Sequence, residues 1–191
     1  MTPLSMSIEL LRELIALDAQ TGTLTWKPRE ARHFPPTAKQ TGQHKANNWN
    51  SHLAGKPALT YKCRRHGYLT GALFGEWISA HRVVFALTHG RWPSGEIDHI
   101  NGNPADNRPV NLRDVSHQEN QRNMKRPRNN TSGTTGVIFD STHGKWVARI
   151  SANGQRNQHV GCFVSKSDAV AARKAAEALH GYHQNHGRAT E

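Results

Sequence analysis

A carboxylate and an imidazole stand next to each other at Asp98 and His99, and two amide side chains follow at set intervals. Asn111 lies 13 residues after Asp98, and Asn120 lies 22 residues after it. A carboxylate can hold a hard divalent cation, and a histidine that is neutral near pH 7 can accept a proton from water. The adjacent pair therefore has the groups that hydrolysis of a phosphodiester requires.

The residues around this pair predict a strand, a loop, a second strand and a helix. Residues 97–100 alternate as a short half-buried strand, and residues 101–104 (Asn-Gly-Asn-Pro) have the composition of a turn. Residues 110–115 permit a returning strand. Ser116 and Glu119 form a capping-box pattern, which begins a helix with Asn120 in its first turn. Asp98, His99, Asn111 and Asn120 can then converge at one end of the unit.

This arrangement resembles the HNH nucleases, which have the ββα-metal fold, and among them the phage-type and intron-encoded homing endonucleases. The matching segments are 98–103, 106–108, 111–113 and 119–120. The resemblance implies that Asp98 and Asn120 hold a metal ion, Mg²⁺ or Mn²⁺, that His99 activates the water, and that Asn111 orients His99. Because strand side chains alternate, Asp98 and His99 reach opposite sides of the phosphate.

The composition favours a polyanionic partner, which we expect to be double-stranded DNA. The 191 residues have a formal charge of +11, and 35% of them are hydrophobic. Charge alone also fits a merely soluble or ribosome-like basic protein. The two cysteines, Cys63 and Cys162, form neither a disulfide framework nor a CxxC zinc motif. With no membrane-length apolar run and no signal peptide, we expect a location in the cytoplasm of a bacterial or phage-infected cell. We also expect a monomer, although the residues themselves do not specify an oligomeric state.

The first 62 residues predict a small α/β module with an irregular basic segment. Helical spacing covers residues 8–17, a strand covers 23–26, and residues 28–57 show no regular pattern. Residues 18–26 resemble a module that often precedes phage HNH nucleases. We expect the nuclease domain itself at residues 63–126, opening with a hairpin (67–70 and 76–78) and a helix from Ala80 to His89 that Gly90 ends. His81 either contacts DNA or, as we favour, supports the fold.

Basic residues surround the end of the predicted nuclease domain, and residues 127–133 are expected to be a basic linker. Arg122, Lys125, Arg126 and Arg128 fall within seven residues. Such a run is either a solvated linker or a track for DNA phosphates, and we favour the second. Arg113 and Arg122 are either phosphate contacts or ordinary surface ion pairs.

Residues 134–191 predict three strands and one helix. The strands are 137–139, 145–150 and 160–163, and Ser165 caps a helix from Asp168 to His180. The segment resembles the AP2 DNA-binding domain at 136–137, 145–148, 150, 161, 163 and 175–181. The resemblance implies that an exposed sheet face enters the major groove, with contacts from Lys145, Trp146, Arg149 and Arg156. The alternative is a sheet with ordinary surface charges.

The sequence as a whole therefore predicts an α+β protein: an N-terminal module, a central ββα-metal unit and an AP2-like C-terminal domain. The predicted function is a metal-dependent DNA endonuclease of the homing type, whose site is chosen by the AP2-like domain. A catalytically silent DNA-binding regulator is the alternative from another class. RNA binding is the weakest hypothesis, because it leaves the spacing from Asp98 to Asn120 unexplained.

Overall fold

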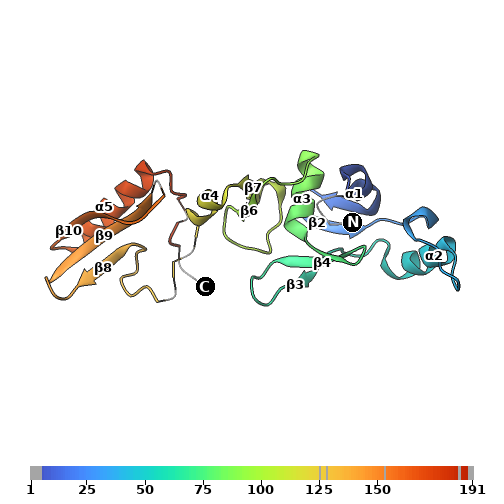
Figure 1. The fold of residues 1–191 in the computed structure, drawn as a ribbon, viewed down its shortest axis with the longest axis horizontal. Coiled ribbons are helices and arrows are strands. Elements are labelled where there is room, and N and C mark those ends of the chain that lie inside the picture. Colours follow the sequence, from blue (N-terminus) through green and yellow to red (C-terminus); the bar gives the residue numbers. More distant parts are fainter. Residues whose placement is uncertain (1–5, 125, 128, 153, 185, 189–191) are drawn as a thin grey trace. The chain divides into compact units, whose positions relative to one another are not determined.

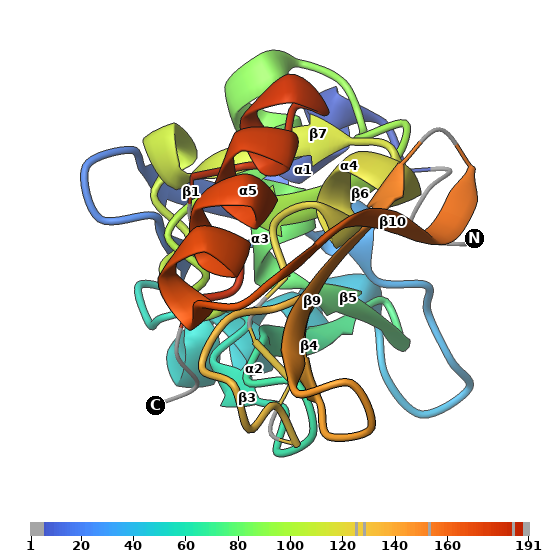
Figure 2. The same ribbon diagram turned by 90° about the vertical axis from the view of Figure 1, so that its left-hand side faces the viewer.

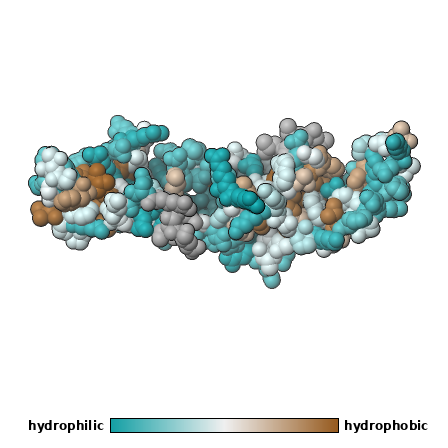
Figure 3. All heavy atoms as spheres, turned by 90° about the horizontal axis from the view of Figure 1, so that it is seen from below, coloured by the Kyte–Doolittle hydropathy of each residue, from teal (hydrophilic) through white to brown (hydrophobic). Residues whose placement is uncertain are grey.

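The computed structural model describes residues 6–124, 126–127, 129–152, 154–184 and 186–188. The chain divides into two compact units, residues 1–114 and 115–191 (Figure 1). Helices and strands occur in both, which confirms the α+β class. Most of the face in Figure 3 is hydrophilic. Among the described residues, no helix combines the length and the apolar character needed to cross a bilayer.

The first unit opens with helix α1 (Ile8–Leu14), strand β1 (Ile15–Asp18) and strand β2 (Thr23–Trp26). The predicted strand at 23–26 is confirmed, but the predicted helix is wrong at its last three residues. Ile15 adopts extended φ and ψ angles and pairs with Trp26 in an antiparallel ladder. Ile15 is buried in the strand, so pairing with β2 outweighs the helical spacing of the apolar residues.

The segment predicted to be irregular, residues 28–57, contains the 3₁₀ turn η2 (Ala31–His33) and helix α2 (Gly42–Leu53). The prediction was therefore wrong here. Thr41 caps the helix by accepting a hydrogen bond from the His44 amide at 3.1 Å. Ala46 is buried, and Trp49 packs edge-on against Trp26. Because so few apolar residues anchor α2, it lacks the periodicity by which a helix is recognised.

A three-stranded antiparallel sheet follows, made of β3 (Tyr61–Lys62), β4 (Leu69–Leu73) and β5 (Glu76–Ser79). The predicted hairpin is thus confirmed. Helix α3 (Ala80–His89) begins and ends where the sequence predicts, because Gly90 adopts the left-handed conformation at its C-cap. The fully buried Val83 and Val84 of α3 and Leu11 and Leu14 of α1 lie in the apolar core. This core supports the strands that follow.

Strands β6 (Glu96–His99) and β7 (Leu112–Val115) pair in a two-stranded sheet, with the 3₁₀ turn η3 (Pro109–Asn111) before β7. Both predicted strands are confirmed, although β6 lies one residue earlier than predicted and β7 starts two residues late. Asp114 ties β7 to the segment before β6, because its carboxylate accepts hydrogen bonds from Arg91 and from the Ser94 and Gly95 amides. The Ile97 and Leu112 side chains join the core.

The second unit contains helix α4 (His117–Gln121), strands β8 (Val137–Asp140), β9 (Lys145–Ala152) and β10 (Gln155–Phe163), and helix α5 (Lys166–Leu179). The capping box of Ser116 and Glu119 is present, as predicted. The strands form an antiparallel sheet in the order β10-β9-β8, and α5 packs against it (Figure 2). Strand β10 starts at Gln155, earlier than predicted. The prediction missed its first residues because register irregularities before Gly161 interrupt the alternation of its side chains.

Candidate active site

His99 is the last residue of β6, and its side chain is buried, with 5% of the residue exposed. Its Nε2 atom lies 3.0 Å from the Oδ1 atom of Asn107. An amide oxygen only accepts hydrogen bonds, so this contact requires the proton on Nε2. In the neutral ring, Nδ1 then keeps its lone pair, which is the form that a general base needs.

Two aromatic rings, those of Tyr68 and His81, pack against this imidazole. Tyr68 stacks on His99 with 5.7 Å between ring centroids, and His81 meets His99 edge-on at 5.3 Å. Burial lowers the pKa of His99 below its usual value, although Asn107 and nearby carboxylates oppose the shift. Burial, with a smaller effect from His99, also lowers the pKa of His81 to about 3. Both histidines are therefore neutral at pH 7.

Asp98 precedes His99 on β6 and is buried, with 7% of the residue exposed. Its Oδ2 atom accepts a hydrogen bond from Nε of Arg113 at 2.8 Å and lies 2.6 Å from Nη2 in an ion pair. The structure thus places Arg113, predicted either to bind a phosphate or to form an ion pair, in an ion pair with the predicted metal ligand. The guanidinium balances the buried carboxylate and holds it in position.

Asn111, predicted to orient His99, braces the loop between the two strands. Its Oδ1 accepts a hydrogen bond from the Asn101 amide at 2.9 Å, and its Nδ2 donates to Asn101 Oδ1 at 3.0 Å and to the Asp106 carbonyl at 2.8 Å. The loop begins directly after His99 and carries Asn107. Asn111 therefore shapes the segment that presents Asn107, and Asn107 makes the hydrogen bond to the imidazole.

A turn near the N-terminus lies against the backbone that carries Asn107. The Asp18 carboxylate accepts hydrogen bonds from the Gln20 amide at 2.9 Å and from the Thr21 hydroxyl at 2.8 Å, which shapes this turn. Gly22 follows with a φ of +72°, and a Cβ atom there would lie 2.3 Å from the Asn107 carbonyl carbon. Only glycine fits so close to the Asn107 backbone, so this turn helps to place the His99 partner.

Asn120, the other predicted metal ligand, lies on α4 in the second unit. That Asn120 and Asp98 bind the same metal ion stays a prediction from the motif spacing. Among the basic residues nearby, Arg122 lies over the Tyr182 ring, and Arg126 donates to the Gly133 carbonyl at 2.7 Å. Lys125 and Arg128 lie outside the described residues.

The predicted DNA contacts on β9 divide between the two faces of the sheet. Trp146 packs beside the buried cluster of Val137, Ala148 and Ala169, on the face that α5 covers. Lys145 and Arg149 are exposed, and strand alternation turns them to the other face. Arg156 is exposed on β10. The structure thus separates Trp146 from the lysine and arginine with which it was predicted to act.

The donor set at this site is sparse for a metal ion. The described residues contain no group of three or more His, Cys, Asp or Glu side chains that could hold one. Asp98 supplies one carboxylate, and His99 beside it is a neutral imidazole. A single buried carboxylate fits a hard cation that takes its other ligands from water, an amide oxygen and the substrate, as Mg²⁺ commonly does.

Sequence reasoning did not single out Tyr68 or Asn107. Asn107 lies within a segment that matches the HNH pattern, so its amide was visible as a candidate without a role. Tyr68 lay in the predicted hairpin, and no local signal indicates that its ring stacks on His99. His81, which was expected to support the fold, lies against His99.

A family model and a phage protein match parts of this chain. The model of the HNH endonuclease family matches residues 79–122, so the chain carries an HNH endonuclease domain there. HNH nucleases generally use divalent metal ions. Protein 3.8 of Escherichia phage T7 is 37% identical over 78 residues, which are 40% of this chain and 64% of that protein. The chain thus spans about 64% of the length of this relative. No solved structure matches the chain.

Proposed function

We propose that this protein is a metal-dependent DNA endonuclease in which His99 is the general base. The observation that carries the proposal is the buried, neutral imidazole held through Nε2 by Asn107, directly after a carboxylate in the matched HNH region. Nδ1 of His99 would accept a proton from water as the water attacks the phosphorus atom. The bond from phosphorus to the 3′ oxygen would then break.

We further propose that Asp98, with Asn120 as the second ligand implied by the motif, holds Mg²⁺ or Mn²⁺. When bound, the cation would supply Lewis-acid stabilisation of the phosphate and of the leaving oxygen. Arg113 already holds the Asp98 carboxylate in position, and its exposed portion is a candidate contact for the neighbouring phosphate. Asn111 would act through the loop that presents Asn107 to His99.

The second unit would select the DNA site in a homing-type enzyme. A three-stranded antiparallel sheet with one helix on one face supports an AP2-like arrangement. Lys145 and Arg149 are the candidate contacts on the other face, and Arg122, Arg126 and Arg156 are candidate phosphate contacts around it. We propose double-stranded DNA as the partner, because the chain has a formal charge of +11.

The test is a cleavage assay on supercoiled plasmid and on DNA flanking the gene, with Mg²⁺, with Mn²⁺ and with a chelator. We expect metal-dependent nicks or breaks, and mapping of the ends should show 3′-hydroxyl groups at the cut sites. Arg113→Gln should weaken cleavage, because the Asp98 carboxylate loses its partner. If no cation supports cleavage while DNA still binds, the protein is the catalytically silent regulator instead.

A further inference from the structure

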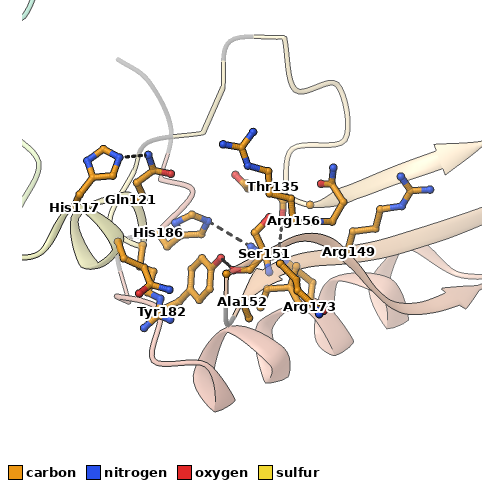
Figure 4. Close-up of a pocket in the computed structure, with 17 residues that line it drawn as sticks. His117, Gln121, Thr135, Arg149, Ser151, Ala152, Arg156, Arg173, Tyr182 and His186 are labelled. Atoms are coloured by element: carbon orange, nitrogen blue, oxygen red, sulfur yellow. Dashed lines mark hydrogen bonds between the residues drawn. The ribbon is translucent and has the colours of Figure 1, made fainter.

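A basic hollow lies within the second unit, with a volume of about 860 Å³. Its walls come from α4, the segment before β8, the ends of β9 and β10 that adjoin each other, α5 and the C-terminal segment (Figure 4). Strand β8 pairs with β9 only as far as Val137 and Ala148, whereas β9 continues to Ala152. The hollow therefore lies beside the part of β9 that extends past its neighbour.

The charges around this basic hollow have one sign. Arg122, Arg149, Arg156 and Arg173 line it, and the described lining residues include no carboxylate. Behind the wall, the buried Glu177 lies 3.3 Å from Arg173 Nη2, but it also pairs with Lys174 at 2.7 Å. The single negative charge of Glu177 therefore neutralises only one of the two positive charges, those of Arg173 and Lys174. Positive charge gathered in a concave surface attracts an anion more strongly than the same charge spread over a flat one.

Buried polar atoms of the wall add a second, independent observation. Within the described part of the chain, Arg173 Nη1, Thr135 Oγ1 and His186 Nδ1 are buried without a hydrogen-bond partner. Arg173 is only 2% exposed. Buried polar groups normally have hydrogen-bond partners. Three unpartnered atoms in the wall of one hollow therefore indicate that a polar group of a ligand supplies the missing hydrogen bonds.

All three of these atoms can donate. His186 Nε2 lies 3.5 Å from Nη2 of Arg173, and a guanidinium only donates, so the proton of the neutral ring belongs on Nδ1. Burial lowers the pKa of His186 and keeps this ring neutral at pH 7. Tyr182 lies under the guanidinium groups of Arg122 and Arg173, at 5.8 and 5.1 Å from its ring centroid. The wall thus combines arginine side chains with buried donors behind them, a set that suits a ligand with several acceptor oxygens.

We propose that this basic hollow is a phosphate-binding site that holds the backbone of a DNA strand. That the phosphate belongs to a DNA strand rests on the proposed function. The chemistry of the site itself requires only a phosphate group. Arginine favours phosphate because its planar fork can donate two parallel hydrogen bonds. The volume exceeds that of one phosphate and leaves room for the adjoining sugar.

The test uses the full chain carrying His99→Ala, so that bound DNA is not cut. Inorganic phosphate is titrated while the ring signals of His117 and His186 are followed by NMR, and a labelled 12-nucleotide DNA strand is titrated by fluorescence anisotropy. The same measurements are made with Arg122→Gln/Arg156→Gln, and with Lys166→Gln, which removes a positive charge from α5 outside the hollow. Circular dichroism checks that each variant is folded.

We expect phosphate to shift both histidine signals, and bound DNA to weaken the apparent affinity for phosphate by competition. The double variant should bind both ligands about tenfold more weakly, and the salt dependence of DNA binding should fall by roughly one to two phosphate contacts. Lys166→Gln should leave phosphate binding unchanged. Unchanged phosphate binding in the double variant would overturn the site, and phosphate binding without competition from DNA would overturn the assignment to a strand. None of these measurements follows cleavage. They therefore test the phosphate-binding site separately from the proposed nuclease activity.

Discussion

Both units bury polar side chains, but they differ in the size of their apolar cores. In the first unit, an apolar cluster draws on α1, β2, β5, α3 and the strand that carries His99. In the second, the buried apolar cluster of Val137, Ala148 and Ala169 is small, and the buried residues also include polar ones: Asn123, Ser132, Arg173, Glu177 and His186. The difference indicates that the two units have different roles. An apolar core can hold a desolvated histidine in one position, whereas a polar interior keeps charge close to a surface that binds anions.

The largest effect should come from removing the imidazole in the first unit. We expect His99→Ala to lower the cleavage rate by roughly 10²- to 10⁴-fold, as for loss of a general base, while DNA affinity is retained. Single-turnover cleavage and fluorescence anisotropy measure the two quantities. His143→Ala removes an exposed histidine of the second unit and is the matched control. Equal cleavage by His99→Ala and the parent protein would remove His99 from the mechanism.

The next effect tests whether the packing of the first unit places the partner of His99. Gly22→Ala forces a Cβ atom against the Asn107 backbone, whereas Gly55 has a similar φ of +78° and open space around it. We expect Gly22→Ala to lower the free energy of unfolding by roughly 1–3 kcal/mol more than Gly55→Ala does, since overpacking adds to the shared backbone strain. Urea unfolding measures this difference.

The same pair of variants should differ in activity. Gly22→Ala displaces Asn107 and should slow cleavage under conditions in which the protein stays folded, while Gly55→Ala should not. Equal stabilities and equal rates for the two variants would show that the turn at Gly22 does not support the site.

A smaller effect distinguishes the two asparagines of the loop. Asn107→Asp places a carboxylate on Nε2 of His99 and should raise the pKa of the imidazole, so the acidic limb of the kcat/KM profile moves to higher pH by about one unit. Asn111→Ala should lower stability with a smaller shift of that limb, because its side chain bonds to Asn101 and Asp106. The reverse pattern would assign the orienting role to Asn111.

The smallest effect concerns stability in mild acid. The folded-state pKa of His81 is about 3, below the usual 6.5, so the unfolded chain binds a proton that the folded protein does not. The contribution to stability is fully present above pH 6.5 and is lost as the pH falls towards 3. We expect a loss of about 1 kcal/mol between pH 6.5 and 5.5, measured by urea unfolding.

His81→Phe provides the comparison for this prediction, because it keeps an aromatic ring and removes the titration. The stability of this variant should depend less on pH over the same interval. If the parent protein and His81→Phe lose stability equally between pH 6.5 and 5.5, another group is responsible for the acid sensitivity.

Elements with local signals were predicted well, and elements held by distant contacts were not. Helix α3 matches its prediction because apolar spacing and a terminal Gly90 both lie within the segment, and the Ser116–Glu119 capping box is equally local. Helix α2 was missed because it has few apolar residues, and distant contacts hold it, such as the hydrogen bonds between Asn50 and the Arg29 backbone. Strand β1 was predicted as helix because its pairing with β2 is not visible in residues 8–17.

The sequence by itself determined which groups are available for chemistry: the carboxylate of Asp98, the imidazole of His99, the amides spaced after them, and a large positive charge. Only the tertiary structure decided how they are held. It places Asn107 on His99, Arg113 on Asp98, and Tyr68 and His81 around the imidazole. The reason is physical: residue type and spacing specify what a side chain can donate or accept, whereas its partner and its burial depend on which distant segments fold against it.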